Sequence, residues 1–136
     1  MTPLRALDQL DVTGGQLADS DGLRKDPVMS VDKTGEACVV KLAGELDLYN
    51  APQVRDALVK ACADSPERVV VDLTEVDFID STALGVLIEA RRQLPNNRAF
   101  LLAGPGLETR RALEISGLDR HFTVHQSVPE ALLAKV

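Results

Sequence analysis

The stretch VDFIDSTALGVLIEA, from Val76 to Ala90, decides the fold. Three small polar residues, Asp80, Ser81 and Thr82, interrupt what would otherwise be a long apolar run. Such residues are typical of a helix N-terminus, because their side chains accept hydrogen bonds from the N–H groups that the first turn leaves without partners. We therefore predict a helix over residues 82–94, with Asp80 or Ser81 as its cap.

The predicted helix is apolar nearly all the way round its first two turns. A helix of this kind buries two faces. One face must pack on a sheet, and the other meets a neighbouring helix or is offered to a partner. Gly85 lies in the same turns and is expected to allow another backbone to approach closely.

Extended and helical segments alternate on both sides of this helix. The expected extended segments are a hairpin over residues 28–47 with KTGE at its turn, then RVVVDLT, RAFLLAG and HFTVH. Further helices are expected from Asn50 to the DSPE stretch, over GLETRRALEISGL as far as Gly117, and over SVPEALLAKV. The alternation predicts an α/β fold, with helices packed on a mostly parallel sheet to which the first hairpin adds an antiparallel strand.

The domain boundary is expected near Pro27. Residues 1–26 contain two adjacent glycines and scattered aspartates without a sustained period, which predicts a flexible N-terminal lead. The remaining residues, 27–136, are predicted to form one domain that folds without the lead. A chain of 136 residues with 45% hydrophobic side chains has enough apolar surface for a core of this size.

The charge of the chain restricts the class of partner. A net charge of −6 argues against nucleic acid or an anionic membrane, since both attract cationic surfaces. Only 3% of residues are aromatic and none is Trp, so few side chains can stack on bases or sugars. No apolar segment resembles a signal peptide or a membrane span, and a cytoplasmic location is expected. A protein is the expected partner.

Cysteine and histidine give little reason to expect a redox or metal site. Cys38 and Cys62 are too few for a disulfide framework or a thiolate zinc site, and packed, reduced thiols are expected. His121 and His125 flank a β-like segment, where a rise of about 3.3 Å per residue separates them by about 13 Å. No metal or cofactor is predicted.

Two roles are possible for Ser81 at the start of the predicted helix. It can help cap the first turn, which is what such residues do most often. It can also carry a phosphate, because unpaired N–H groups and the positive end of the helix dipole tolerate added negative charge. The pattern alone does not decide between the cap and the phosphate acceptor.

Three longer stretches resemble a known family. GELDLYNAPQVRDAL, VVVDLTEVDFIDSTALGVLIEARRQL and LEISGLDRHFTVHQSVPEAL resemble, in order and spacing, the STAS domain of bacterial anti-sigma factor antagonists. The resemblance covers residues 28–136. It implies that an anti-sigma factor that is also a serine kinase phosphorylates Ser81. It also implies that the unphosphorylated form binds that partner and frees the sigma factor, and that phosphorylation ends the binding.

The same resemblance implies a docking surface and a set of partners. The docking residues that it implies are Asp47, Tyr49, Asn50, Asp80, Ser81, Thr82 and Leu84. The resemblance implies that the anti-sigma factor kinase is the main partner and that a serine phosphatase is a transient one. The chain itself is expected to be a monomer or weak dimer, not an enzyme, that regulates transcription in a stress response. Thr82 stands where a second Ser is common in the family and is a less accessible alternative acceptor.

Other functional classes fit the sequence less well. A hydrolase with Ser81 as nucleophile needs a G-x-S-x-G elbow or a nearby base, and the sequence around Ser81 supplies neither. A phospho-aspartate receiver would use Asp72, but the acidic pair expected after its first strand is missing. The main alternative is a STAS domain that acts as a scaffold or senses a small ligand or nucleotide. The AGPG turn at residues 103–106 matches no phosphate-binding loop.

Overall fold

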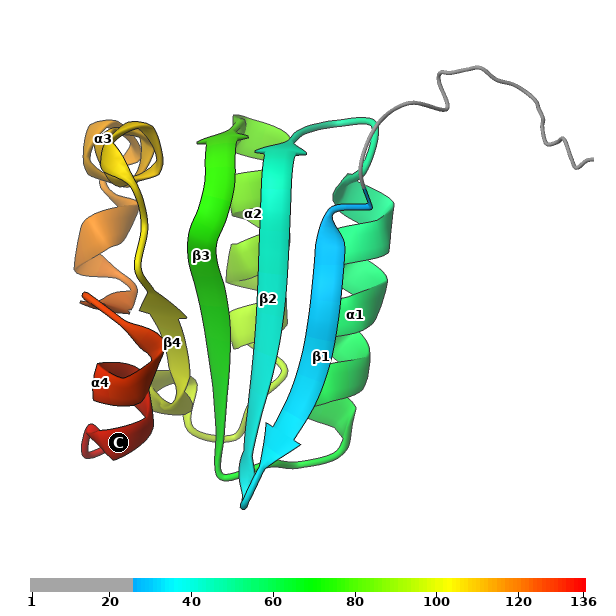
Figure 1. Ribbon diagram of the computed structural model, residues 1–136, viewed down its shortest axis with the longest axis vertical. Helices are drawn as coiled ribbons and strands as arrows, with labels where there is room; N and C mark the ends of the chain where they lie inside the picture. The colour runs from blue at the N-terminus through cyan, green and yellow to red at the C-terminus, as the bar shows by residue number, and fades with distance from the viewer. Residues whose placement is uncertain (1–25) are drawn as a thin grey trace, which may run out of the picture.

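The computed structural model describes residues 26–136, in which five strands and four α-helices alternate (Figure 1). The strands are β1 (Val28–Thr34), β2 (Ala37–Leu46), β3 (Arg68–Ile79), β4 (Phe100–Ala103) and β5 (Thr123–His125). The helices are α1 (Ala51–Ala63), α2 (Ser81–Arg91), α3 (Leu107–Ser116) and α4 (Val128–Leu133). Two short 3-10 turns, η1 (Asn97–Ala99) and η2 (Leu118–Arg120), precede β4 and β5.

The strands form one sheet in the order β1-β2-β3-β4-β5. β1 pairs with β2 in antiparallel fashion, and the three other pairs are parallel. The hairpin turn contains Gly35 at a φ of 63°, a left-handed conformation that glycine adopts without steric cost. The predicted α/β fold, with a mostly parallel sheet and an antiparallel N-terminal strand, is confirmed.

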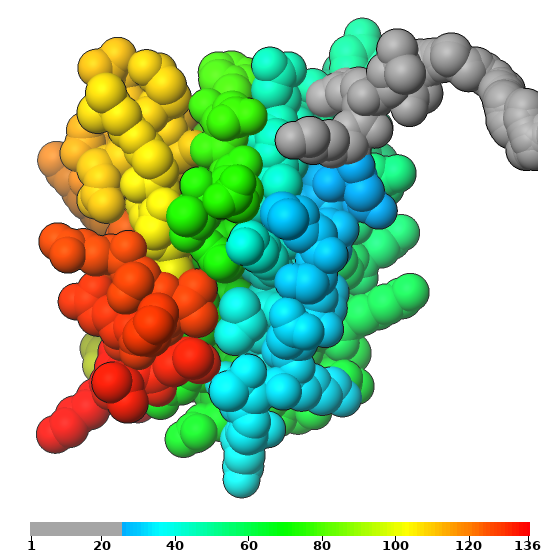
Figure 2. All heavy atoms as spheres, viewed as in Figure 1, coloured from blue at the N-terminus to red at the C-terminus, as the bar shows by residue number. Residues whose placement is uncertain are grey.

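Alternate residues of β3 pack into two separate hydrophobic cores, one on each face of the sheet. Val69 and Val71 pack into the main core beneath the helices, whereas Val70 packs on the other face of the sheet with Ala131 of α4. Helices α1 and α2 lie behind the sheet in Figure 1, and α4 lies in front of it. The space-filling view shows that α4 covers only the β4 side of that front face (Figure 2). The sheet is therefore covered fully on one face and partly on the other.

Strand β3 is longer than predicted. It was expected to end with RVVVDLT, before a loop leading to the helix, but it continues to Ile79 and leaves only Asp80 as a link. The register between β2 and β3 shifts twice, between Lys41 and Ala43 and between Gly44 and Glu45. These irregularities keep the strands paired through the polar part of β3, which a strict alternation of polar and apolar residues would not predict.

Other element boundaries also differ from the predictions. Helix α2 runs over 81–91 instead of 82–94, and residues 97–99 form a 3-10 turn before the shorter β4. His121 follows η2 and lies outside β5. The prediction that both histidines lie in one extended segment is therefore wrong. Pairing with β4 begins at Thr123, and the segment before it turns instead of extending.

The final helix depends on a buried arginine. α4 has six residues, and the guanidinium of Arg68 donates hydrogen bonds to the carbonyl oxygens of Ala131 and Ala134, at 2.8 and 2.6 Å. The last carbonyls of a helix lack partners within the helix. Arg68, at the start of β3, supplies the missing donors and joins the C-terminal helix to the centre of the sheet.

Helix α2 buries one broad side, and the predicted burial of two faces is not confirmed, because Ser81, Thr82 and Gly85 are exposed. Its buried residues are Ala83, Leu84, Val86, Leu87 and Ala90. They pack in the main core together with residues of α1, and an ion pair of 2.8 Å between Arg55 and Glu89 bridges the two helices. Gly85 differs from its prediction, since it is exposed and a Cβ atom there would meet nothing within 4 Å. No neighbouring element of residues 26–136 requires a glycine at this position.

Cys38 and Cys62 are both buried, unpaired thiols within the main core. Burial raises the pKa of both, that of Cys62 to about 11. A raised pKa disfavours the reactive thiolate. The two cysteines are therefore packing residues in this structure. The predicted lead, apart from Asp26, lies outside the described residues.

Candidate functional site

Ser81 is the first residue of α2 and is exposed. Leu46 and Ile79, the last residues of β2 and β3, are paired across the sheet. The chain segments that follow them, the loop 47–50 and the N-terminus of α2, therefore begin side by side at the carboxyl edge of the sheet. We call these two segments together the Ser81 surface, defined as residues 47–50 and 80–82.

Asp80 joins the two segments. One oxygen of its carboxylate, Oδ1, accepts a hydrogen bond of 3.0 Å from the Ala83 N–H and caps α2. The other oxygen, Oδ2, accepts one of 3.1 Å from the Leu48 N–H in the loop. The Asp80 N–H donates to the Leu46 carbonyl oxygen at 3.0 Å. Asp80 is thus the cap of the helix, and the Ser81 side chain is not needed for that task.

A second set of hydrogen bonds fixes the loop itself. The Asp47 carboxylate accepts from the N–H groups of Tyr49 and Asn50, at 3.0 and 3.3 Å. The Asn50 side chain accepts from the Asp47 N–H at 2.9 Å and donates to the Glu45 carbonyl oxygen at 2.7 Å. Asn50 occupies the N-cap position of α1 but makes no capping hydrogen bond, unlike its prediction as a cap. Its amide holds the loop closed instead.

The residues predicted for docking divide by exposure. Tyr49, Ser81 and Thr82 are exposed, and Asp47 and Asp80 are half-buried. Asn50 and Leu84 are only 8% and 6% exposed, because Asn50 is enclosed by the loop and Leu84 faces the core. Those two residues shape the surface from beneath and offer little area to a partner.

One neighbour of these residues, Leu48, was not singled out from the sequence. Leu48 is 61% exposed in the loop, between Asp47 and Tyr49. An apolar residue in a short loop between a strand and a helix is a weak sequence signal, and the bond from Leu48 to Asp80 has no sequence signal at all.

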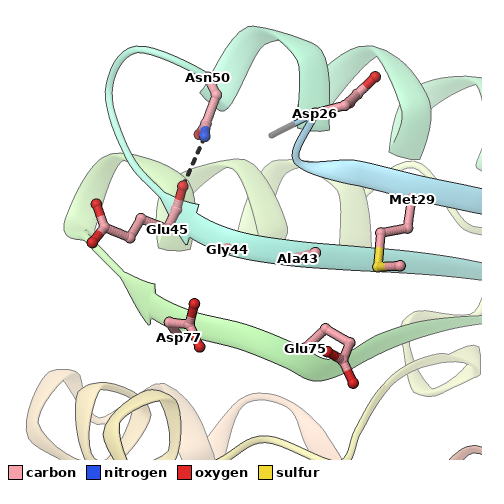
Figure 3. Close-up of a pocket in the computed structure, with 8 residues that line it drawn as sticks. All are labelled: Asp26, Met29, Ala43, Gly44, Glu45, Asn50, Glu75 and Asp77. Atoms are coloured by element: carbon pink, nitrogen blue, oxygen red, sulfur yellow. Dashed lines mark hydrogen bonds between the residues drawn. The ribbon is translucent and has the colours of Figure 1, made fainter. Parts of the chain in front are cut away.

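An open groove of about 480 Å³ lies next to the loop (Figure 3). Its lining residues are Asp26, Met29, Ala43, Gly44, Glu45, Asn50, Glu75 and Asp77. The view shows Asp77 and Glu75 on β3 beside the end of β2, and the hydrogen bond from Asn50 to the backbone of Glu45. Four carboxylates in the lining make the groove acidic, and Ser81 is not among the residues that line it.

Within residues 26–136, no group of three or more His, Cys, Asp or Glu side chains is arranged to hold a metal ion. In the same part of the chain, no helix is long and apolar enough to cross a membrane.

His125 lies far from Ser81. Asp72, Ala103 and His125 are aligned across β3, β4 and β5. Ile79 is seven residues beyond Asp72, which at about 3.3 Å per residue places the end of β3 roughly 20 Å further along the sheet than His125. His125 therefore lies too far along the sheet to act as the base of a Ser81 nucleophile.

Asp72 is not presented as the phospho-acceptor of a receiver domain. It is only 8% exposed, and its Oδ1 accepts hydrogen bonds from the N–H and the hydroxyl of Thr74. A carboxylate that acts as a phosphate acceptor must be open to the phosphate donor. The position of Asp72 therefore does not support the receiver alternative.

Comparisons with known proteins place the chain among anti-sigma factor antagonists. The family model described as STAS domain matches residues 28–131. The anti-sigma-F factor antagonist RsfB of Mycobacterium tuberculosis is 31% identical over 105 residues, which cover 77% of this chain and 85% of RsfB. The crystal structure of an anti-sigma factor antagonist from Mycobacterium paratuberculosis is 32% identical with a TM-score of 0.71, covering 76% of this chain and 88% of that chain.

SpoIIAA, a Bacillus cell fate determinant, has the same fold at 24% identity. Its unphosphorylated and phosphorylated forms match with TM-scores of 0.64 and 0.58. Each match covers 76% of this chain, and the matches cover 91% and 95% of the SpoIIAA chains, respectively. At this level of identity the likeness shows a shared fold.

Proposed function

Because this chain belongs to the STAS domain family and is similar to anti-sigma factor antagonists, we propose that it binds an anti-sigma factor through the Ser81 surface and so frees a sigma factor. One observation carries the proposal. Asp80 alone caps α2 and ties the loop to it, so the exposed Ser81 hydroxyl has no structural task at the helix N-terminus. It is open to a partner and to modification.

The finer part of the proposal is a phosphorylation switch at Ser81. The partner anti-sigma factor is a serine kinase. Its bound ATP supplies the phosphoryl group, which the Ser81 Oγ attacks while the bond to the β-phosphate oxygen breaks. ADP leaves, and the hydroxyl proton passes to a base on the kinase. This chain contributes the acceptor hydroxyl and its position, and the partner contributes the catalysis. A serine phosphatase removes the phosphate.

Charge explains why phosphorylation would end binding without unfolding the domain. Phosphate adds about −1.5 to −2 charges at the positive end of the α2 dipole, where negative charge is tolerated. The Asp80 carboxylate is the preceding side chain, and Asp77 is exposed on the strand before it. The added charge therefore enters an already negative surface, and the partner must desolvate it there.

Mapping the phosphate tests this proposal directly. The purified protein is incubated with Mg-ATP and each anti-sigma factor kinase encoded in the same genome, and phosphopeptides are mapped by mass spectrometry. We expect phosphate on Ser81 and none after Ser81→Ala. Phosphate on Thr82 or Thr74 only, or unchanged phosphorylation of Ser81→Ala, would show that Ser81 is not the acceptor.

The alternative of a nucleotide-sensing STAS domain finds less support in the described residues. The groove in Figure 3 lies next to the loop, and its lining includes four carboxylates. Carboxylates repel phosphate groups. An anion such as a nucleotide is therefore a poor match for this groove.

A further inference from the structure

Two large apolar side chains stand out from the loop beside Ser81. Leu48 is 61% exposed and Tyr49 is 82% exposed. The chain has only three Phe and one Tyr, and two of the three Phe, Phe100 and Phe122, are buried with their ring centroids 6.1 Å apart. A chain with so few aromatic residues places its only tyrosine in solvent, where it adds nothing to the core.

The loop that carries these side chains is fixed in advance. The Leu48 N–H donates to Asp80 Oδ2 at 3.1 Å, and the Tyr49 N–H donates to Asp47 Oδ1 at 3.0 Å. The buried Asn50 amide closes the loop from beneath. A side chain on a fixed backbone loses less conformational entropy on binding than one on a mobile loop. Leu48 and Tyr49 are therefore exposed on a backbone that is already fixed, which favours binding to a partner.

We propose that Leu48 and Tyr49 form an apolar anchor that inserts into an apolar pocket of the anti-sigma factor, a pocket bordered by basic side chains. This inference rests on the proposed function and deepens it. Tyrosine is enriched among the few residues that supply most of the affinity at protein interfaces. The anchor is continuous with Ser81, because Asp80 bonds to both the Leu48 and the Ala83 backbone.

The chemistry of the pocket border follows from the charges around the anchor. Glu75 and Asp77 are exposed on β3 near the loop, and the chain has a net charge of −6. A partner with basic residues around its apolar pocket would match these carboxylates and be steered toward them. Leu48 and Tyr49 supply most of the affinity for the partner, and the carboxylates of Glu75 and Asp77 orient the partner as it binds.

The anchor also changes how the switch acts. A phosphate on Ser81 would lie at the edge of a contact from which Leu48 and Tyr49 exclude water. Burial of a charge in an apolar contact is costly unless the charge is paired. The anchor therefore increases the effect of phosphorylation, since the same charge at a fully hydrated border would cost much less.

The test is calorimetric titration of the full chain against each purified anti-sigma factor encoded in the same genome. Leu48→Ala and Tyr49→Ala are each expected to weaken binding at least tenfold. Tyr49→Phe, which keeps the ring, should recover most of the affinity lost in Tyr49→Ala. Leu133→Ala is the matched control, because Leu133 is 86% exposed on α4, on the opposite face of the sheet. It should bind like the wild type, and all four variants should keep the wild-type circular dichroism spectrum.

The outcomes separate this inference from the proposed function. If the wild type binds none of the anti-sigma factors, the proposed function is wrong and the anchor with it. If the wild type binds and both alanine variants bind within threefold of it, the anchor alone is wrong. An equal loss in Leu133→Ala would show that the apolar contact is not located at the loop. If Leu48→Ala does not fold, Tyr49→Ala decides.

Discussion

The carboxylate of Asp80 accepts a hydrogen bond from the backbone N–H of Leu48, 32 positions earlier in the chain, at 3.1 Å. The same carboxylate caps α2 through the Ala83 N–H. One side chain thus sets both the loop and the helix N-terminus that form the Ser81 surface. The first prediction follows from this double role.

Asp80→Ala should lower the free energy of unfolding by about 1–2 kcal/mol, because loss of an N-cap costs about 1 kcal/mol and the Leu48 N–H loses its acceptor as well. Asp80→Asn keeps one oxygen acceptor and should cost less. Urea denaturation of the two variants and the wild type measures the difference. Equal stability of Asp80→Ala and wild type would mean that solvent replaces both bonds without loss.

Ser81→Glu should keep the fold and lose the partner. A negative charge at the first position of a helix is compatible with the helix dipole, so the thermal melting curve should stay close to that of the wild type. Binding to the anti-sigma factor should weaken at least tenfold, or about 1.4 kcal/mol, while Ser81→Ala should bind like the unmodified protein. Titration and circular dichroism together check both parts. A Ser81→Glu variant that binds as well as wild type would contradict the repulsion mechanism.

Asn50→Ala should destabilise the domain more than a surface substitution on the same helix. The change removes the two hydrogen bonds that the Asn50 amide makes with the Asp47 N–H and the Glu45 carbonyl oxygen, and each such bond contributes about 0.5–1.5 kcal/mol. Gln53→Ala, at an exposed position of α1, is the matched control and should stay within about 0.5 kcal/mol of wild type. Denaturant unfolding of the pair is the measurement, and similar values for both would show that the loop does not need the amide.

Gly85→Ala and Gly104→Ala should change stability in opposite directions. A Cβ atom at Gly85 meets nothing within 4 Å, so alanine should stabilise α2 by up to about 1 kcal/mol. A Cβ atom at Gly104 would lie 2.6 Å from the Thr74 hydroxyl oxygen, and the residue has a φ of +67°, so alanine there should destabilise. Thermal melting of both variants tests the contrast. The same sign of change in both would contradict the described environments.

The thiols of Cys38 and Cys62 should react slowly in the folded protein. Burial raises both pKa values, that of Cys62 to about 11, so little thiolate forms near pH 8. These pKa values are higher in the folded than in the unfolded state. The contribution of the two thiols to the free energy of unfolding is therefore fully present below about pH 8.5 and declines as the pH rises toward 11. Reaction with a chromogenic disulfide, with and without denaturant, measures the protection. Full reaction within seconds in the folded state would disprove it.

The start of α2 was accessible from the sequence because its signal is local. Asp80, Ser81 and Thr82 mark a helix N-terminus in consecutive positions, and the apolar residues after them require burial. The alternation of strands and helices likewise follows from patterns of a few residues. Local signals of this kind predicted the fold class and the position of Ser81 correctly.

The parts that sequence reasoning missed depend on contacts between distant segments. β3 continues through Glu75 and Asp77 because β2 lies beside it with two shifts of register, and polar residues alone suggest a loop. Asn50 was expected to cap α1, but its amide is better placed to bridge Asp47 and Glu45. Neither the length of β3 nor the role of the Asn50 amide can be predicted without knowing which backbone lies beside it.

The hydrogen bonds from Arg68 to α4 have a consequence for how the domain opens. A six-residue helix is too short to persist by itself, so α4 depends on its contacts with the sheet, which are the packing of Ala131 and the hydrogen bonds from Arg68 at the start of β3. Opening of this end would release the guanidinium and the helix in a single event. Amide hydrogens of α4 should therefore exchange with solvent together, as one cooperative unit, independently of the Ser81 surface at the other end of β3.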